Sequence, residues 1–359
     1  MMLSQKKKRI IKIVVIVLSS IVVSIPTIIL PFSTFVIYEG VFNMRFETPN
    51  YLKMSPSDFE GLDYERCEFE SDLTLTGYKY SREEVLKKGV IVIAHGYGDG
   101  GHNKYLPYID KFTKNGFYVF AYDAQGNDQS EGKSVTGFPQ GIIDLDNAID
   151  YAQSIEEYKN LPFLLFGHSW GAYSAGNVLN HHPEIKGAVL VAGFNESEDM
   201  LAQYPRKVLG VLVDAFLLPY VSFYETIKFG KDYASITAVD GMEKTDAKIL
   251  IVHSEDDGRV PIEYGYDIYY DEFSENDRFE FKHYENKGHI NMLFSDEAIS
   301  YRESLENGYK SYLKEIGKRD KSSLKEQYFK AQQINKKQYY EPNEDLSNQM
   351  IDLFSKACA

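Results

Sequence analysis

Ser169 is the residue whose surroundings most clearly indicate chemistry. It stands in Gly167-His168-Ser169-Trp170-Gly171, a Gly-x-Ser-x-Gly pattern that follows an apolar run and precedes a stretch of helical character. In this context the pattern predicts a sharp strand-to-helix turn that lifts the serine hydroxyl above the edge of a sheet. Glycine at both ends removes Cβ atoms that would collide in so tight a turn. The serine could then act as a nucleophile, provided that a general base takes its proton.

Short apolar runs alternate with segments of helical spacing along most of the chain. Runs typical of strands occupy residues 89–94, 117–121, 162–166, 188–192, 248–252 and 279–283. Alternating strands and helices of these lengths predict an α/β fold, with a mostly parallel sheet and helices on both faces. Residues 66–70 and 73–80 alternate as half-buried strands do, so we expect an antiparallel start to the sheet.

The order of residues along the chain selects the general base. In α/β-hydrolases a serine on such a turn is followed by an acid and then a histidine, each on a loop at the carboxyl end of a strand. Of the eight histidines, only His283 and His289 follow the acids that could serve. His283 falls inside the strand at 279–283, whereas His289 falls in the loop after it. We therefore expect His289 to be the base and activity to fall when it is protonated.

Three neighbouring carboxylates at positions 255–257 compete for the role of the acid. The stretch 253–261 resembles the His-Gly-x-x-Asp-x-x-Val-Pro signature of α/β-hydrolases of the monoacylglycerol lipase, lysophospholipase and serine aminopeptidase type. Aligned on its histidine and its Val-Pro pair, the resemblance selects Asp257, with Asp256 as the alternative. Ser254 stands where that signature has glycine.

The same resemblance extends to two further loops. Residues 95–98, His-Gly-Tyr-Gly, match the family's His-Gly loop, which implies that the backbone N–H groups of Tyr97 and Trp170 form the oxyanion hole. Residues 123–132 resemble the family's Asp-x-x-Gly-x-Gly-x-Ser-x-Gly loop, with two departures in its middle. The resemblance covers about residues 65–315 and leaves both ends of the chain outside.

The N-terminus combines a basic cluster with a long apolar run. Residues 6–9 are Lys-Lys-Lys-Arg, and residues 10–30 are apolar apart from one lysine, three serines, a threonine and a proline. That length predicts one transmembrane helix with the basic cluster on the cytoplasmic side. No Ala-x-Ala-like site follows it, which argues against a cleaved signal peptide. We expect an uncleaved, single-pass membrane anchor with the catalytic domain outside the cytoplasm.

The chain is therefore predicted to divide into four parts. They are a cytoplasmic tip and anchor at 1–37, an irregular juxtamembrane segment at 38–64, an α/β-hydrolase domain at 65–317, and a C-terminal helical extension at 318–359. A helical cap is expected at about 194–247 within the domain. Its residues 208–223 are mostly apolar, with Asp214 as their only charge, which is consistent with an acyl-binding cap or with helices that only pack on the domain.

An apolar cap over Ser169 favours a carboxylic ester with a hydrophobic acyl chain, of the lysophospholipid or monoacylglycerol type, cleaved through an acyl-enzyme on that serine. A serine aminopeptidase on the same fold is the alternative, because Glu196, Glu198 and Asp199 could hold a substrate ammonium. A third interpretation is a non-catalytic binding protein on this fold. The ordered serine, acid and histidine argue against it.

The composition of the chain argues against nucleic-acid binding and against a bound metal or nucleotide cofactor. The formal net charge is −14, although the first 38 residues hold five basic groups and no acidic one. So acidic a domain is unsuited to nucleic acid. We expect no metal or nucleotide cofactor, because the sequence shows no ligand-spaced cluster and no dinucleotide fingerprint. Cys67 and Cys358 lie far apart in sequence, which leaves open both a disulfide and two free thiols.

Overall fold

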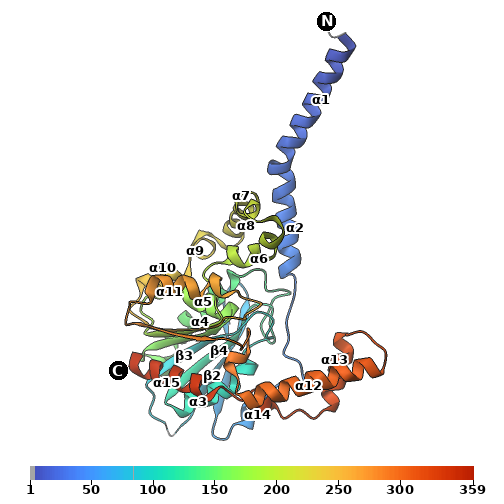
Figure 1. Ribbon diagram of the computed structural model, residues 1–359. Coiled ribbons are helices and arrows are strands. Elements are labelled where there is room, and N and C mark those ends of the chain that lie inside the picture. The colour runs from blue at the N-terminus through green and yellow to red at the C-terminus, as the bar shows by residue number, and fades with distance from the viewer. Residues whose placement is uncertain (1–4, 84) are drawn as a thin grey trace.

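The computed structural model describes residues 5–83 and 85–359, and shows a helix-covered sheet from which one long helix projects (Figure 1). Within these residues eight strands form one sheet in the order β1-β2-β4-β3-β5-β6-β7-β8. The strands are β1 (Asp63–Glu70), β2 (Thr74–Ser81), β3 (Gly89–Ala94), β4 (Phe117–Asp123), β5 (Phe163–His168), β6 (Gly187–Val191), β7 (Lys248–Ser254) and β8 (Phe279–Tyr284).

The sheet is mostly parallel, which confirms the predicted fold class. Neighbouring strands from β4 to β8 pair in parallel, whereas β1 pairs with β2, and β2 with β4, in the antiparallel sense. All six side chains of β3 are buried, as expected for a strand covered on both faces. Val90 and Val92 belong to the core on one face, and Ile91 and Ile93 to the core on the other.

Helices cover both faces of the sheet. On one face lie α4 (Gln140–Ser154), α5 (Trp170–Val178), α10 (Ala238–Lys244) and α11 (Tyr266–Phe273). The other face is covered by α3 (Leu106–Lys114), the start of α12 (Asp296–Glu315) and α15 (Glu344–Ala357). Two short helices, α13 (Ser322–Ala331) and α14 (Lys336–Tyr339), follow α12 and pack against it.

Between β6 and β7 the described chain forms five helices. The last of them, α10, covers the sheet, and we call the other four the cap. They are α6 (Ser197–Leu209), α7 (Leu212–Phe216), α8 (Leu218–Phe229) and α9 (Lys231–Ala234). Figure 1 shows the cap at the end of the domain from which the N-terminal helix projects, with α6 to α8 beside the lower part of that helix. The cap therefore stands next to the N-terminal helix.

The N-terminal helix runs from Gln5 to Phe42 and is long and apolar enough to cross a membrane. It consists of α1 (Gln5–Ser24), a π-helical turn (Ile25–Ile29) and α2 (Leu30–Phe42). Pro26 lies in the π-helical turn, where its missing N–H and its ring disturb the regular ladder. Residues 38–42, which we predicted to be irregular, are helical, because Tyr38 and Phe42 bury their rings against the cap and the domain.

Polar contacts as well as apolar ones hold α2 to the cap. The Tyr224 hydroxyl donates to Glu39 at 2.6 Å, and the Lys228 ammonium also contacts that carboxylate. Deeper in the joint, the hydroxyls of Tyr38 and Ser197 both donate to Oε1 of Glu225 at 2.7 Å. Glu225 is fully buried, and its Oε2 has no partner among the described residues. Burial raises the pKa of Glu225 to about 7, so Oε2 is where a proton would sit.

The raised pKa of Glu225 predicts that the joint between α2 and the cap is weaker at alkaline pH. Its folded-state pKa lies above the 4.5 of an ordinary glutamate, so the protonated carboxyl contributes its full stabilisation below pH 4.5. This stabilisation is lost as pH rises through about 7. Glu225→Gln keeps the acceptor for Tyr38 and Ser197 without the charge. We expect it to raise stability at about pH 8 by roughly 3 kcal/mol or less and to flatten the pH dependence of thermal unfolding. Glu243→Gln, at an exposed carboxyl on α10, is the control, and an unchanged profile in Glu225→Gln would contradict the prediction.

The last helix, α15, contributes to the main core. Leu346, Met350, Leu353 and Phe354 are almost completely buried against β6, β7 and α3. Its end also places Cys358 beside Gly89, while Cys67 lies on β1. Both cysteines are described and both are free thiols, which answers the question that the sequence left open.

Truncation of Phe354 should destabilise the whole domain. Its ring packs edge-on against those of Phe112 and Phe117, so Phe354→Ala leaves a cavity between α15, α3 and the sheet. We expect a loss of about 3–5 kcal/mol in the free energy of unfolding. Asn348→Ala, at an exposed position on the same helix, should change it by less than about 0.5 kcal/mol. If denaturant titrations gave Phe354→Ala a loss as small as that of Asn348→Ala, the packing of α15 would not contribute to the stability of the domain.

Candidate active site

Ser169 lies on the sharp turn between β5 and α5. Its backbone has φ 57° and ψ −119°, a strained conformation for a residue with a side chain. The two glycines make the turn possible: a Cβ at Gly167 would lie 2.2 Å from the carbonyl oxygen of Gly171, and a Cβ at Gly171 would lie 2.0 Å from that of Ala94. The Ser169 amide N–H donates to Val191 O at 2.8 Å, which fixes the turn to β6.

The structure brings Ser169, His289 and Asp257 together in one hydrogen-bonded row. His289 Nε2 lies 2.8 Å from Ser169 Oγ, and His289 Nδ1 lies 2.7 Å from Asp257 Oδ2. Because a carboxylate can only accept, Nδ1 carries the proton and Nε2 is free to accept from the serine hydroxyl. All three side chains are less than one-tenth exposed. This is the geometry that a serine nucleophile and its base require.

Asp257 is held as an anion. Burial by itself would raise its pKa, but hydrogen bonds from His253 and His289 and from the Val260 amide outweigh it and hold the pKa of Asp257 well below its ordinary value. The amides of Arg259 and Val260 donate to Oδ1 at 2.9 and 3.0 Å. The second carboxylate oxygen therefore remains for the imidazole of His289.

The two competing carboxylates contact other groups. Oδ1 of Asp256 accepts from the Ser254 hydroxyl at 2.6 Å and from the Gly288 amide at 2.7 Å. Asp256 thus holds the loop that carries His289 without touching the imidazole. Glu255 is exposed and lies 3.5 Å from His283, on the outer strand β8.

Two amides near Ser169 have no acceptor. The backbone N–H groups of Tyr97 and Trp170, which the resemblance assigns to an oxyanion hole, donate to no atom of the residues that the structure describes. Trp170 opens α5, and its ring lies edge-on to that of Tyr97 at a centroid distance of 6.0 Å. The loop of Tyr97 is fixed by His95, whose Nε2 accepts from the Ala124 amide at 2.9 Å.

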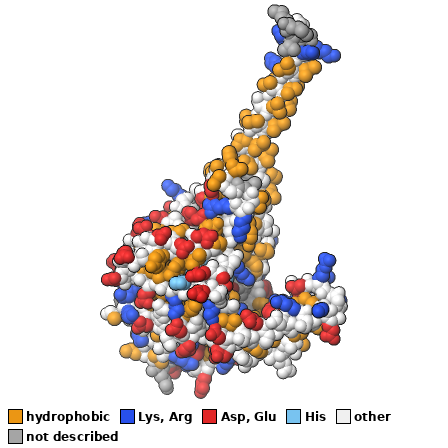
Figure 2. Space-filling model, in the orientation of Figure 1, with side chains coloured by type: hydrophobic (Ala, Val, Ile, Leu, Met, Phe, Trp, Pro, Cys, Tyr) orange, Lys and Arg blue, Asp and Glu red, His pale blue; other side chains and the backbone are white. Residues whose placement is uncertain are grey.

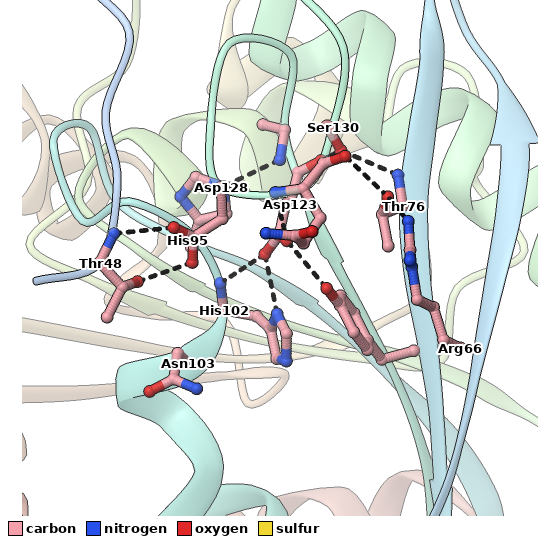
Figure 3. Close-up of polar contacts among 12 residues, drawn as sticks. Thr48, Arg66, Thr76, His95, His102, Asn103, Asp123, Asp128 and Ser130 are labelled. Atoms are coloured by element: carbon pink, nitrogen blue, oxygen red, sulfur yellow. Dashed lines mark hydrogen bonds and ion pairs between the residues drawn. The ribbon is translucent and has the colours of Figure 1, made fainter. Parts of the chain in front are cut away.

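A second buried network joins the neighbouring loops around His102, Asp123 and Asp128 (Figure 3). Asp123 Oδ1 accepts from both the amide and the Nδ1–H of His102, at 3.1 and 2.8 Å. On the adjoining loop, Asp128 accepts from the amide and the hydroxyl of Thr48, at 2.8 and 2.7 Å. Figure 3 shows His102 pointing at Asp123 and Thr48 pointing at Asp128. These contacts secure the segment after α2 to the loops around the site.

Sequence reasoning missed His168, the residue before the serine. Its ring lies against that of His289, with centroids 5.1 Å apart, and its Nε2 lies 3.2 Å from the His289 carbonyl oxygen. Its Nδ1 lies 3.2 Å from the hydroxyl of Tyr105, which in turn donates to Asp99. Burial lowers the pKa of His168 well below its ordinary value, so this ring is neutral. The sequence feature that could have pointed to His168 is its position directly before Ser169.

One of the three acidic residues considered for a substrate ammonium is already paired with a cation. Asp199 pairs with Arg206 at 2.6 Å, and Arg206 also pairs with Asp214. Burial and the neighbouring Asp199 and Glu198 carboxylates raise the pKa of Glu196 to about 7. The cation paired with this acidic cluster is therefore Arg206 of the chain itself.

Replacing Asp257 should disable the base without disturbing the fold of the loop. Asp257→Asn keeps the shape but favours the wrong tautomer of His289, so we expect kcat for ester hydrolysis to fall by about 10³–10⁴-fold. Glu255→Gln, at an exposed carboxyl two positions away, should leave kcat close to that of the native chain. Comparable losses in both variants would rule Asp257 out as the residue that orients His289.

Comparison with known proteins agrees with this architecture. A family model described as serine aminopeptidase, S33, matches residues 86–229, which include Tyr97, Ser169 and Trp170. The human protein ABHD12B is 25% identical over 218 residues, which are 59% of this chain and 56% of that protein. The chain therefore spans just over half the length of this relative.

Two solved structures share the fold. The Pyrococcus furiosus esterase Pf2001 superposes with a TM-score of 0.53 at 19% identity, over 76% of this chain and 98% of that one. The acetyl xylan esterase from Paenibacillus sp. R4 gives a TM-score of 0.50 at 14% identity, over 66% of this chain and 82% of that one. Identities this low show the fold alone, and that fold is the predicted one.

Proposed function

We propose that this chain, which belongs to the α/β-hydrolase superfamily, is a membrane-anchored serine esterase that cleaves hydrophobic carboxylic esters of the lysophospholipid or monoacylglycerol type. The observation that carries the proposal is the row Ser169–His289–Asp257, with oxygen and nitrogen atoms 2.7–2.8 Å apart. A histidine on a solvated loop would not be held by hydrogen bonds between a strained serine and a buried carboxylate.

In the proposed reaction Ser169 Oγ attacks the ester carbonyl carbon while His289 Nε2 takes the hydroxyl proton. Asp257, ionised at neutral pH, stabilises the imidazolium that forms. The free amides of Tyr97 and Trp170 receive the developing oxyanion, a contribution of about 3–4 kcal/mol for each donor. His289 then returns the proton to the leaving alcohol. Water activated by the same nitrogen releases the acid from Ser169.

A serine aminopeptidase is the second candidate, and the description of the matching family model favours it. It would need acidic groups to bind a substrate ammonium. Asp199 is neutralised by Arg206, and the raised pKa of Glu196 leaves that carboxyl partly protonated at neutral pH. We therefore place the ester first.

The N-terminal helix is the proposed membrane anchor. Every side chain of α1 is exposed on the described chain or nearly so, although most of them are apolar. The basic cluster at residues 6–9 would stay on the cytoplasmic side and the domain outside it.

Covalent labelling tests the nucleophile. A fluorophosphonate should label the native chain, and Ser169→Ala should abolish the label. Ser174→Ala, on the same helix with its hydroxyl bonded to Trp170 O, is the matched control and should label normally. Full labelling of Ser169→Ala would refute the assignment.

The substrate class needs a separate panel. Under the ester proposal, kcat/KM should rise with acyl-chain length among glycerol esters and stay negligible for aminoacyl amides. The reverse order would favour the aminopeptidase while leaving Ser169 as the nucleophile.

A further inference from the structure

The cap carries apolar side chains that no described part of the chain covers. Six of them, on α6, α7, α8 and the turn between α6 and α7, are more than half exposed, and we call them the cap patch: Val208, Val211, Leu212, Phe216, Phe223 and Ile227. Clustered exposure of this kind marks a surface that contacts a membrane or another protein. Figure 2 shows the N-terminal helix as an apolar column that rises from a body rich in charged side chains.

The length of the helix fixes the height of the cap relative to a membrane. If the basic cluster lies at one headgroup layer, the hydrocarbon begins near Ile10. Pro26 is then about 24 Å further along at 1.5 Å per residue, and tilt of the helix only shortens the vertical distance. The hydrocarbon core is about 30 Å thick. Pro26 therefore lies inside it or at its far edge.

The cap is attached to the helix at this level. The hydroxyl of Tyr220, at the start of α8, donates to Pro26 O at 2.8 Å. The next turns of the same face of α8 contact α2 through Tyr224 and Lys228. The start of α8 consequently lies at the depth of Pro26 and cannot stand clear of the bilayer.

The cap patch adjoins further apolar surface. Phe223 and Ile227 sit beside the face of α8 that contacts α2, and α2 itself exposes Phe32 and Ile37. Asp214, which lies between Leu212 and Phe216 of the cap patch, pairs with Arg206 at 2.8 Å. Pairing reduces the cost of moving that carboxylate toward a low dielectric.

We propose that the cap patch lies in the headgroup and upper acyl region of the leaflet next to the domain, with lipid as its occupant. The chain is then held by two contacts, the anchor helix and the cap, and its cap meets the surface in which a hydrophobic ester resides. The inference rests on the proposed anchor but not on the proposed esterase activity.

Depth measurements on the full chain in phosphatidylcholine vesicles test this arrangement. An environment-sensitive fluorophore is attached to Val211→Cys or Phe216→Cys, and the native chain, labelled in parallel, gives the background from its two half-buried cysteines. Leu86→Cys, 89% exposed on the loop before β3, is the control in water. Val17→Cys, in the middle of α1, reports on the anchor. Quenching is measured with nitroxide-bearing lipids and with iodide.

Probes at positions 211 and 216 should be quenched by shallow lipid nitroxides and shielded several-fold from iodide, while the probe at 86 shows the reverse. Iodide quenching at 211 and 216 equal to that at 86 would overturn the proposal. Shielding from iodide without lipid quenching would also overturn it and would indicate a second copy of the chain on the patch. A probe at 17 that escapes deep nitroxides would instead refute the anchor, so the two failures are distinguishable.

Discussion

The close approach of α5 to β3 is the constraint on which the rest of the site depends. No Cβ fits at Gly167 or Gly171, because the carbonyl oxygens of Gly171 and Ala94 already occupy that space. This contact forces Ser169 into its positive φ and aims its hydroxyl at the loops beyond β7 and β8. The same contact places the start of α5, where the Trp170 amide has no acceptor among the described residues, beside the His-Gly loop. The proposed nucleophile and one of the proposed amide donors thus share one geometric origin.

The same loop is in contact with the end of the N-terminal helix. The Tyr97 hydroxyl donates to Val41 O at 3.3 Å, and its ring packs against those of Phe42 and Phe46. Tyr38 and Phe42 form a small core with Phe229 of the cap. The helix is therefore a packed part of the domain, continuous with the cap and with the loop whose amide we assign to the oxyanion. An anchor attached through a flexible tether would leave these groups independent of the membrane.

Sequence reasoning reached the parts of the molecule that local rules determine. Gly-x-Ser-x-Gly after an apolar run predicts the turn, because backbone sterics are local, and alternating runs predict the parallel sheet. The order of the chain isolated His289, since so few histidines follow the acids. The choice among positions 255–257 needed a family signature, because three adjacent carboxylates are equivalent by composition alone.

Contacts between segments far apart in the chain could not be predicted from the sequence. The helix continues to Phe42 because Tyr38 and Phe42 are buried by residues almost two hundred positions away, which no local pattern encodes. Likewise α15 completes the core from the end of the chain. The contacts of His168 with His289 and of Glu225 with Tyr38 also join segments far apart in the sequence.

The most direct test of the central claim is to trap the acyl-enzyme on a true substrate. The chain is mixed with a long-chain glycerol ester, quenched in acid within one turnover, digested and analysed by mass spectrometry. Our account predicts the acyl group on the peptide that contains Ser169, at a level that rises before steady state. Turnover of the ester without an acyl group on that peptide would contradict it.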